Sequence, residues 1–183
     1  MKHFVKICVV LTLVCTLMTA LLAVVNSVTD PLIRENEAKK RVEILSDFFP
    51  EMSEDYVSHT SDVSGVSLVY EIKDGDGALL GYCVEVVKTG YAGDVSMMVA
   101  LDAQQVLCGV SLVSHSETKG ITEKKEADAL CDSFIGQKGK QKFTESGGVV
   151  EKIAGATYSS RAVLDGVNAA VQAVALVKGG ASS

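Results

Sequence analysis

Aromatic residues and basic charge are both scarce in this chain of 183 residues. It has no tryptophan and only five tyrosines and five phenylalanines, which argues against the aromatic platform on which single-stranded nucleic acid stacks. The first 29 residues hold two of the 17 lysines and arginines and no acid, so the rest carries 15 basic and 23 acidic groups, a net charge of −8. A protein that binds a phosphate backbone needs a basic face. We therefore expect no nucleic-acid partner.

The signatures of self-sufficient enzymes are also missing. The sequence has no G-x-S-x-G, H-E-x-x-H or P-loop motif, and no G-x-G-x-x-G that opens a helix after a strand. No C-x-x-C pair or nearby histidine offers metal-ligand spacing. We therefore expect neither a catalytic residue nor a metal site. Cys83 and Cys108 lie in apolar, strand-like runs, which favours buried small hydrophobic residues over a disulfide.

One stretch near the N-terminus lacks charge altogether. The 22 residues from 7 to 28 are almost all apolar, and as a helix they would extend roughly 33 Å, enough for the hydrocarbon core of a bilayer. A cleavable signal peptide would have an apolar stretch of about 7–15 residues that ends in an A-x-A-like site. This run is longer and has no such site near its end. It predicts one uncleaved transmembrane helix over 7–28, followed by a soluble domain.

The charges beside this helix leave its orientation open. Lys2 and Lys6 precede it, and four basic residues follow it within about 15 residues: Arg34, Lys39, Lys40 and Arg41. A simple count of these charges favours a cytoplasmic C-terminus. Long domains, however, are translocated largely regardless of charge.

The rest of the chain has the pattern of an α+β domain. A helix is expected over 31–49, after a kink, with Asp30 as N-cap and Pro31 in the first turn, and then an irregular segment over 50–65. Alternating apolar residues predict four antiparallel strands, at 66–72, 79–88, 95–101 and 106–113. A helix at 122–135, a short strand at 149–153 and a helix at 159–177 complete the order. We expect a stalk over 29–65, one domain over 66–178 and a flexible tail over 179–183.

The first candidate binding patch is the stretch 90–93. Gly90 and Gly93 flank Tyr91, so the backbone can approach a planar ligand closely while the tyrosine ring forms one wall. The alternative is an ordinary hairpin bend, and this stretch taken by itself is better explained in that way.

The second patch is the polar stretch 114–120, between a strand and a helix. Glu117 and Thr118 are placed to hydrogen-bond the edge of a heterocycle, and Gly120 leaves room for it. A polar loop that ends in a helix cap is an equal alternative.

The third patch is the stretch 151–161, where a turn of small residues leads into a helix. Gly155 and Ala156 leave space, and Thr157 places a hydroxyl at the helix N-terminus, where backbone N–H groups and the helix dipole favour a phosphate. Capping of the helix by Ser159 or Ser160 is the commoner explanation of such a pattern.

The three patches, in this order behind one membrane helix, resemble the G subunit of Rnf electron-transport complexes and its relative, the C subunit of the sodium-pumping NADH:quinone reductase. The matching stretches are 29–31, 90–93, 117–120 and 155–163. The resemblance implies FMN joined through its phosphate to Thr157 by a separate flavin transferase. It also implies further contacts with the flavin from the three patches: Tyr91, Gly93, Glu117, Thr118, Gly120, Gly155, Ala156 and Ser159. Three residues depart from the family pattern: Lys119 replaces Pro, Glu151 replaces Asp and Ala154 replaces Ser or Thr.

The resemblance also implies a function. It indicates a single-pass membrane protein with residues 1–6 in the cytoplasm and its flavin domain on the extracytoplasmic side. The flavin would carry electrons within an ion-translocating ferredoxin:NAD oxidoreductase, beside other membrane subunits and without catalysis by this chain alone. Two alternatives stay open: a stand-alone flavin reductase or sensor, and a membrane-anchored binding or assembly domain without flavin.

Overall fold

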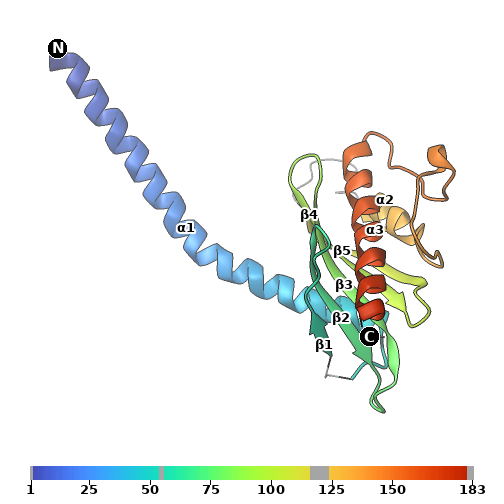
Figure 1. Ribbon diagram of the computed structural model, residues 1–183. Helices are drawn as coiled ribbons and strands as arrows, with labels where there is room; N and C mark the ends of the chain where they lie inside the picture. The colour runs from blue at the N-terminus through green and yellow to red at the C-terminus, as the bar shows by residue number, and fades with distance from the viewer. Residues whose placement is uncertain (1, 54–55, 116–123, 181–183) are drawn as a thin grey trace. The chain divides into compact units, whose positions relative to one another are not determined.

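The computed structural model describes residues 2–53, 56–115 and 124–180 (Figure 1). The helices are α1 (Lys2–Phe48), α2 (Lys124–Asp132), the short 3₁₀ helix η1 (Thr144–Ser146) and α3 (Thr157–Gly180). The strands are β1 (Val57–His59), β2 (Val66–Lys73), β3 (Leu79–Thr89), β4 (Asp94–Asp102) and β5 (Leu107–His115). The chain divides into two compact units, Met1–Lys39 and Lys40–Ser183, and α1 contributes to both.

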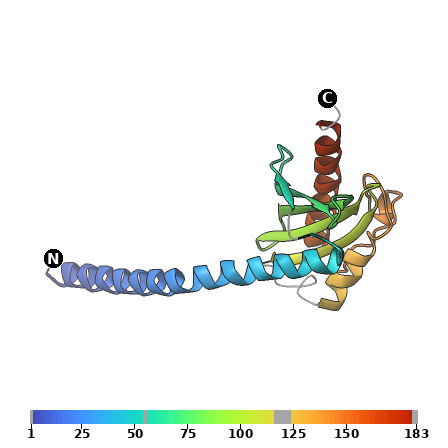
Figure 2. The ribbon, with the colours of Figure 1, turned by 90° about the horizontal axis from the view of Figure 1, so that it is seen from below.

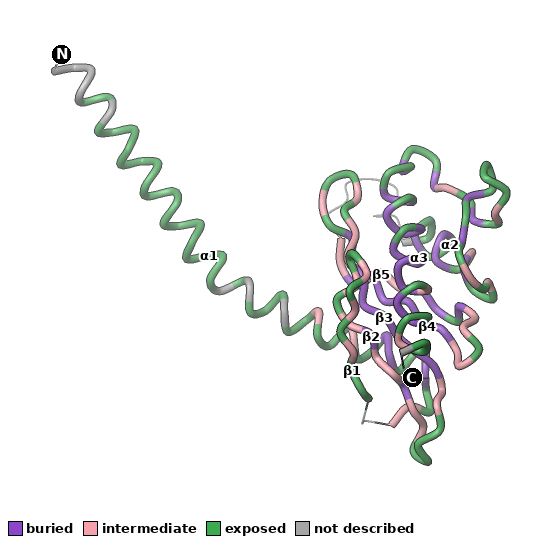
Figure 3. The backbone as a smooth tube through the Cα atoms, in the orientation of Figure 1, coloured by how far each residue is buried: buried purple, intermediate pink, exposed green. Residues whose placement is uncertain are grey.

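The first unit consists of the apolar part of α1. The described side chains between residues 6 and 27 are exposed, as the green colour in Figure 3 shows. The segment is long and apolar enough to cross a membrane. We expected a helix over 31–49 that follows the membrane segment after a kink, with Asp30 as its N-cap. Instead α1 is one helix from Lys2 to Phe48 with Pro31 inside it, so no new helix begins at Asp30. Proline removes one N–H donor, and here the loss of that hydrogen bond does not end a helix of 47 residues.

The second unit is built on an antiparallel sheet with the strand order β1-β2-β3-β4-β5. Its turns use aspartate side chains. Asp74 Oδ1 accepts hydrogen bonds from the N–H groups of Asp76 (2.9 Å) and Ala78 (2.8 Å), and Asp102 closes the β4–β5 turn in the same way. The four predicted strands are confirmed to within two residues at each end. β1 was not predicted, and the expected strand at 149–153 is wrong, because only Val150 makes an isolated bridge there, to Phe143.

Helix α3 covers one face of the sheet (Figures 1 and 2). The alternate residues of β4 that the sequence placed on one face do lie together in this core: Val95, Met97, Val99 and Leu101. They pack with the apolar stripe of α3: Val163, Val167, Ala170 and Val174. Burial of each such side chain stabilises the fold by about 1.5–3 kcal/mol. Although α3 is apolar enough for a membrane span, half of the relevant stretch is buried, which identifies it as a core helix.

The other face of the sheet packs against residues 40–49, the last turns of α1 and the residue after them. The cluster is apolar: Ile44, Leu45, Phe49, Ile72, Cys83, Met98, Ala100 and Val113. Gly109 lets the sheet approach this helix end closely, because a Cβ atom at this position would clash with the ring of Phe48 unless the ring shifted. Polar contacts fix the same turns: Arg41 Nη2 lies 2.7 Å from Glu85 Oε1, and Lys40 Nζ donates to the Val113 carbonyl at 2.6 Å.

Candidate functional site

The stretch 90–93 forms the closed turn between β3 and β4. Thr89 pairs with Asp94 in the ladder, and the Thr89 hydroxyl donates to Asp94 Oδ1 at 3.0 Å. The Gly90 N–H donates to the Gly93 carbonyl at 2.8 Å, which closes the turn. Tyr91 therefore projects from the tip of a fixed hairpin, and its side chain is 73% exposed.

The sheet register brings the second predicted patch to the same end of the sheet. His115, the last residue of β5, pairs with Val95 at the start of β4. The described start of the patch, Ser114 and His115, therefore lies beside the first residues of β4, next to the hairpin turn. Glu117, Thr118 and Gly120, together with Lys119, lie outside the described residues.

The third patch begins α3, and Gly155 sets the direction of the chain there. Its φ of +77° lies in the left-handed region that glycine adopts at little cost. The Ala156 N–H then donates to the Ile153 carbonyl at 3.1 Å, and Ala156 itself is buried. Thr157 follows as the first residue of the helix and is exposed.

Ser159 and Ser160 do not cap this helix, as the alternative interpretation of the sequence would require. The helix begins two residues earlier than expected, so both serines lie inside its first turns. The Ser160 hydroxyl accepts from the Ile153 N–H at 3.1 Å and donates to the Ala156 carbonyl at 2.9 Å. It thereby fastens the preceding turn to the helix. Ser159 is only 2% exposed, whereas Thr157 is an exposed residue.

The start of α3 has the properties of an anion site. Ala156 stands at the cap position, and its methyl group cannot accept a hydrogen bond. The first N–H groups of a helix have no partner within the helix, and the positive end of the dipole lies there. A phosphate at Thr157 would therefore meet backbone donors as well as the threonine hydroxyl.

The structure brings the first and third patches into contact through two tyrosines. The ring centroids of Tyr91 and Tyr158 lie 6.1 Å apart, with the ring planes tilted by 41°. Both side chains are largely exposed, Tyr158 at 69%. Tyr158 is not among the site residues predicted from the sequence. The available signal was a large aromatic residue directly after the candidate threonine, in a chain with few aromatic residues.

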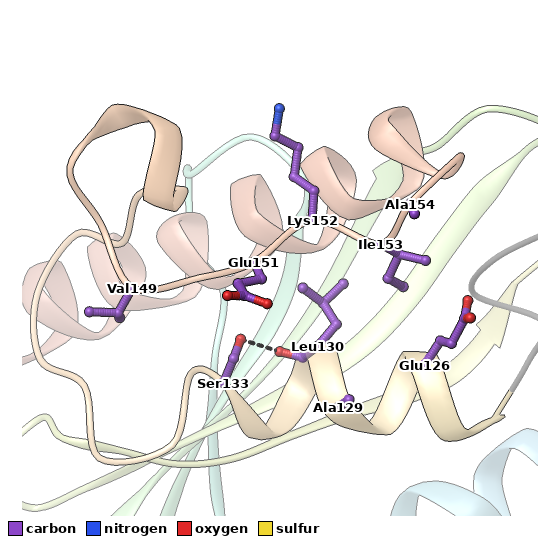
Figure 4. Close-up of a pocket in the computed structure, with 9 residues that line it drawn as sticks. All are labelled: Glu126, Ala129, Leu130, Ser133, Val149, Glu151, Lys152, Ile153 and Ala154. Atoms are coloured by element: carbon purple, nitrogen blue, oxygen red, sulfur yellow. Dashed lines mark hydrogen bonds between the residues drawn. The ribbon is translucent and has the colours of Figure 1, made fainter.

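A pocket of about 390 Å³ lies beside this segment, between α2 and residues 149–154 (Figure 4). Leu130 and Ile153 form its apolar part, and the Ser133 hydroxyl donates to the Leu130 carbonyl at 2.6 Å. Glu126 and Glu151 add two carboxylates to its lining. The pocket is therefore poorly suited to a phosphate, which leaves the start of α3 as the better anion site.

The Lys152 side chain does not neutralise the two carboxylates that line the pocket. In Figure 4 it points away from the pocket, and its ammonium group pairs with the Glu145 carboxylate.

The thiols do not form a redox or metal centre within the described part of the chain. Cys15, Cys83, Cys108 and Cys131 are free, and the described residues include no group of three or more histidine, cysteine or acidic side chains that could hold a metal ion. Burial raises the pKa of Cys83 and raises that of Cys131 from 9.0 to about 12, so both stay protonated near neutral pH. Cys83 is buried as expected, but the expectation for Cys108 is wrong: it is exposed, on the edge strand β5.

The sequence was also compared with known families and proteins. Residues 90–172 match the family model described as "FMN-binding domain". The matched stretch begins at the hairpin turn that carries Tyr91 and includes most of α3. Both contacting patches therefore lie inside it.

Three relatives match over nearly their whole length, and each is the G subunit of an oxidoreductase complex. That of the proton-translocating ferredoxin:NAD(+) oxidoreductase complex of Clostridium ljungdahlii is 30% identical, over 93% of this chain and 91% of that protein. The G subunit of the ion-translocating oxidoreductase complex of Methanosarcina acetivorans is 26% identical, over 97% of this chain and 98% of that protein. The G subunit of the Na(+)-translocating ferredoxin:NAD(+) oxidoreductase complex of Acetobacterium woodii is 25% identical, over 91% of this chain and 89% of that protein.

Proposed function

Since this chain belongs to the G-subunit family of ion-translocating oxidoreductase complexes, we propose that it is the FMN-bearing electron-transfer subunit of such a membrane complex. The resemblance noted from its motifs is thereby confirmed. One observation supports the proposal most strongly: an exposed threonine, preceded by Gly155 and Ala156, begins a helix inside the stretch that matches an FMN-binding domain.

We assign the FMN phosphate to the start of α3. The residues present fit this group, because Gly155 and Ala156 add no bulky side chain and Thr157 supplies an exposed oxygen beside the first backbone donors of the helix. When bound, FMN supplies one- and two-electron chemistry, so the protein has to hold and orient it rather than provide an acid or base. Gly93 and the second patch, with Glu117, Thr118 and Gly120, are proposed to border the flavin ring.

The attachment is proposed to be covalent, through an ester between the phosphate and the Thr157 hydroxyl. A separate flavin transferase would take the FMN group from a flavin dinucleotide, with the Thr157 oxygen displacing the nucleoside monophosphate from phosphorus and the hydroxyl proton going to solvent. The surface of this segment supports the assignment. Glu151, Ala154 and Thr157 are all exposed, whereas Ile153 and Ala156 are buried and hold the segment in place. A transferase can therefore reach the positions that the family motif specifies, including the two at which this chain departs from it.

We further propose that α1 anchors the chain with its N-terminus in the cytoplasm and with the flavin domain on the extracytoplasmic side. The length and apolar composition of α1 support the anchor. The family resemblance supports the extracytoplasmic side for the flavin domain, although the simple count of flanking charges favours a cytoplasmic C-terminus. Other membrane subunits of the complex are the proposed partners, so that electrons pass between anchored carriers without diffusion of the protein.

The test is the intact mass of the full chain, purified from membranes of a host that contains the flavin transferase. We expect the mass of the chain plus FMN less one water, and in-gel flavin fluorescence after denaturation. Thr157→Ala should abolish both signals without unfolding the domain, since the threonine side chain is exposed. The matched control is Thr144→Ala, because Thr144 is also exposed and begins the helix η1.

Retention of flavin by the Thr157→Ala variant would refute the attachment site. In that case Ser159→Ala is the next variant to test. Co-purification of other membrane subunits with the wild-type chain would distinguish a subunit of a complex from a stand-alone flavoprotein.

A further inference from the structure

Tyr91 and Tyr158 form an exposed aromatic surface at one end of the sheet. They come from elements far apart in the chain, the β3–β4 turn and the first turn of α3. Their centroid separation of 6.1 Å lies within the range of favourable aromatic pairs. Both side chains nevertheless leave most of their area in water. Aromatic rings that pack together and remain exposed commonly mark a binding surface.

The other close tyrosine pair of the described residues differs in this respect. Tyr56 and Tyr70 have centroids 5.4 Å apart in an edge-to-face arrangement. Tyr70 is partly buried in the sheet, beside the cluster that packs against residues 40–49, and desolvation raises the pKa of its hydroxyl. That pair is explained by the packing of the domain itself. The pair of Tyr91 and Tyr158 has no comparable place in the core.

We propose that Tyr158, together with Tyr91, is the surface on which the isoalloxazine ring of FMN stacks when the phosphate is held at Thr157. The inference rests on the proposed function and adds Tyr158 to it. Tyr158 directly follows Thr157 in the first turn of α3, within reach of a flavin whose ribityl chain extends from a phosphate at Thr157. Tyr91 reaches the same place from the hairpin, and both residues lie within the stretch that matches an FMN-binding domain.

The geometry also indicates how the flavin is placed. A ring inserted between two others needs parallel planes about 7 Å apart, which is twice a carbon–carbon contact distance. The tyrosines are closer than this, and their planes are tilted by 41°. The isoalloxazine ring therefore lies on the outer side of the pair, with one face against the tyrosines and the other face available. One open face suits a carrier that exchanges electrons with a neighbouring protein.

The experiment uses the full chain loaded with flavin, in the variants Tyr158→Leu, Tyr158→Phe and Tyr91→Leu. A phenol ring in contact with a flavin quenches its fluorescence by donating an electron to the excited state. We therefore expect both leucine variants to show a several-fold longer flavin fluorescence lifetime than the wild type. The Phe variant should also lose quenching but keep the visible circular dichroism of the flavin, because stacking is retained. The matched control, Tyr56→Leu, should leave the lifetime unchanged.

The lifetime is a property of each bound flavin, so incomplete loading does not affect the comparison. Tyr91 lies outside the segment around Thr157, so its variant tests the surface even where the change at Tyr158 lowers the yield of attachment. Flavin-loaded wild-type and leucine variants with equal lifetimes would overturn this inference alone. Equal lifetimes with impaired electron transfer to the other subunits would assign the tyrosines to a protein contact and overturn it too. A wild-type chain without flavin would overturn the proposed function and this inference with it.

Discussion

The ion pair between Arg41 and Glu85 should be one of the more important polar contacts of the domain. Arg41 comes from the end of α1 and Glu85 from the middle of β3, and their charged atoms lie 2.7 Å apart. The Glu85 side chain is only 9% exposed and the Arg41 side chain 31%. Replacement of Arg41 by methionine keeps an apolar stem of similar length but leaves the Glu85 carboxylate buried without its cation.

The expected loss follows from this partial burial. Removal of one partner from a fully buried pair costs about 3–5 kcal/mol, whereas an exposed pair contributes about 0–1 kcal/mol. Because water reaches about a third of the Arg41 side chain, we expect an intermediate loss of about 2 kcal/mol. For a domain of this size, that corresponds to a fall in Tm of about 4–8 °C.

The assay is thermal and urea unfolding of the full chain in detergent, followed by circular dichroism. Lys73→Met is the matched control, because Lys73 pairs with Glu71 at 3.1 Å in a more exposed place, and it should change stability by at most about 0.5 kcal/mol. The double variant Arg41→Met with Glu85→Leu should regain part of the loss. An Arg41→Met variant that is as stable as the Lys73→Met variant would refute the reasoning.

Two further predictions concern the cysteines. The Cys131 thiol ionises near its ordinary pKa of 9.0 in the unfolded chain but, because of burial, only near 12 in the folded one. The unfolded state thus releases a proton that the folded state keeps, and the free energy of unfolding should fall as the pH rises from 9 towards 12. Urea titrations should show that Cys131→Ala flattens this fall by up to about 1.4 kcal/mol per pH unit, and an unchanged slope would contradict the burial argument. Exposed Cys108 should react with a membrane-impermeant maleimide added outside intact cells, and Cys108→Ser should not. Labelling only after lysis would reverse the proposed topology.

Patterns of alternating and helical spacing were sufficient to predict most of the sheet and the apolar face of α3. β4 illustrates why: although both of its faces are covered, four alternate apolar residues lie together in the core under α3, namely Val95, Met97, Val99 and Leu101. The Asp74 turn was predictable because its side chain makes the hydrogen bonds locally. β1 was missed because its three residues are too few to show a period. The stretch 149–153 suggested a short strand, but Val150 makes only an isolated bridge there, to Phe143.

The candidate site was predictable only in part. The motif placed Thr157 at the start of a helix, but the cap pattern placed the helix start too late, since Ser160 bonds back to the preceding turn instead of capping. The contact between Tyr91 and Tyr158 depends on how α3 docks onto the sheet, and this docking cannot be predicted from the local sequence pattern. The same holds for Phe48 over Gly109, where a helix end meets a strand about 60 residues further along the chain.

The alternation of buried and exposed residues before α3 has a consequence for the order of events in the cell. Ile153 and Ala156 point inward while Ala154 and Thr157 face out, and this arrangement exists only once α3 has docked. If the flavin is attached at Thr157 as proposed, the flavin transferase therefore binds a folded surface rather than an extended peptide. A newly made chain that has not completed its core presents no such surface and stays colourless. If the flavin is attached in this way, only copies that have completed their core would carry it.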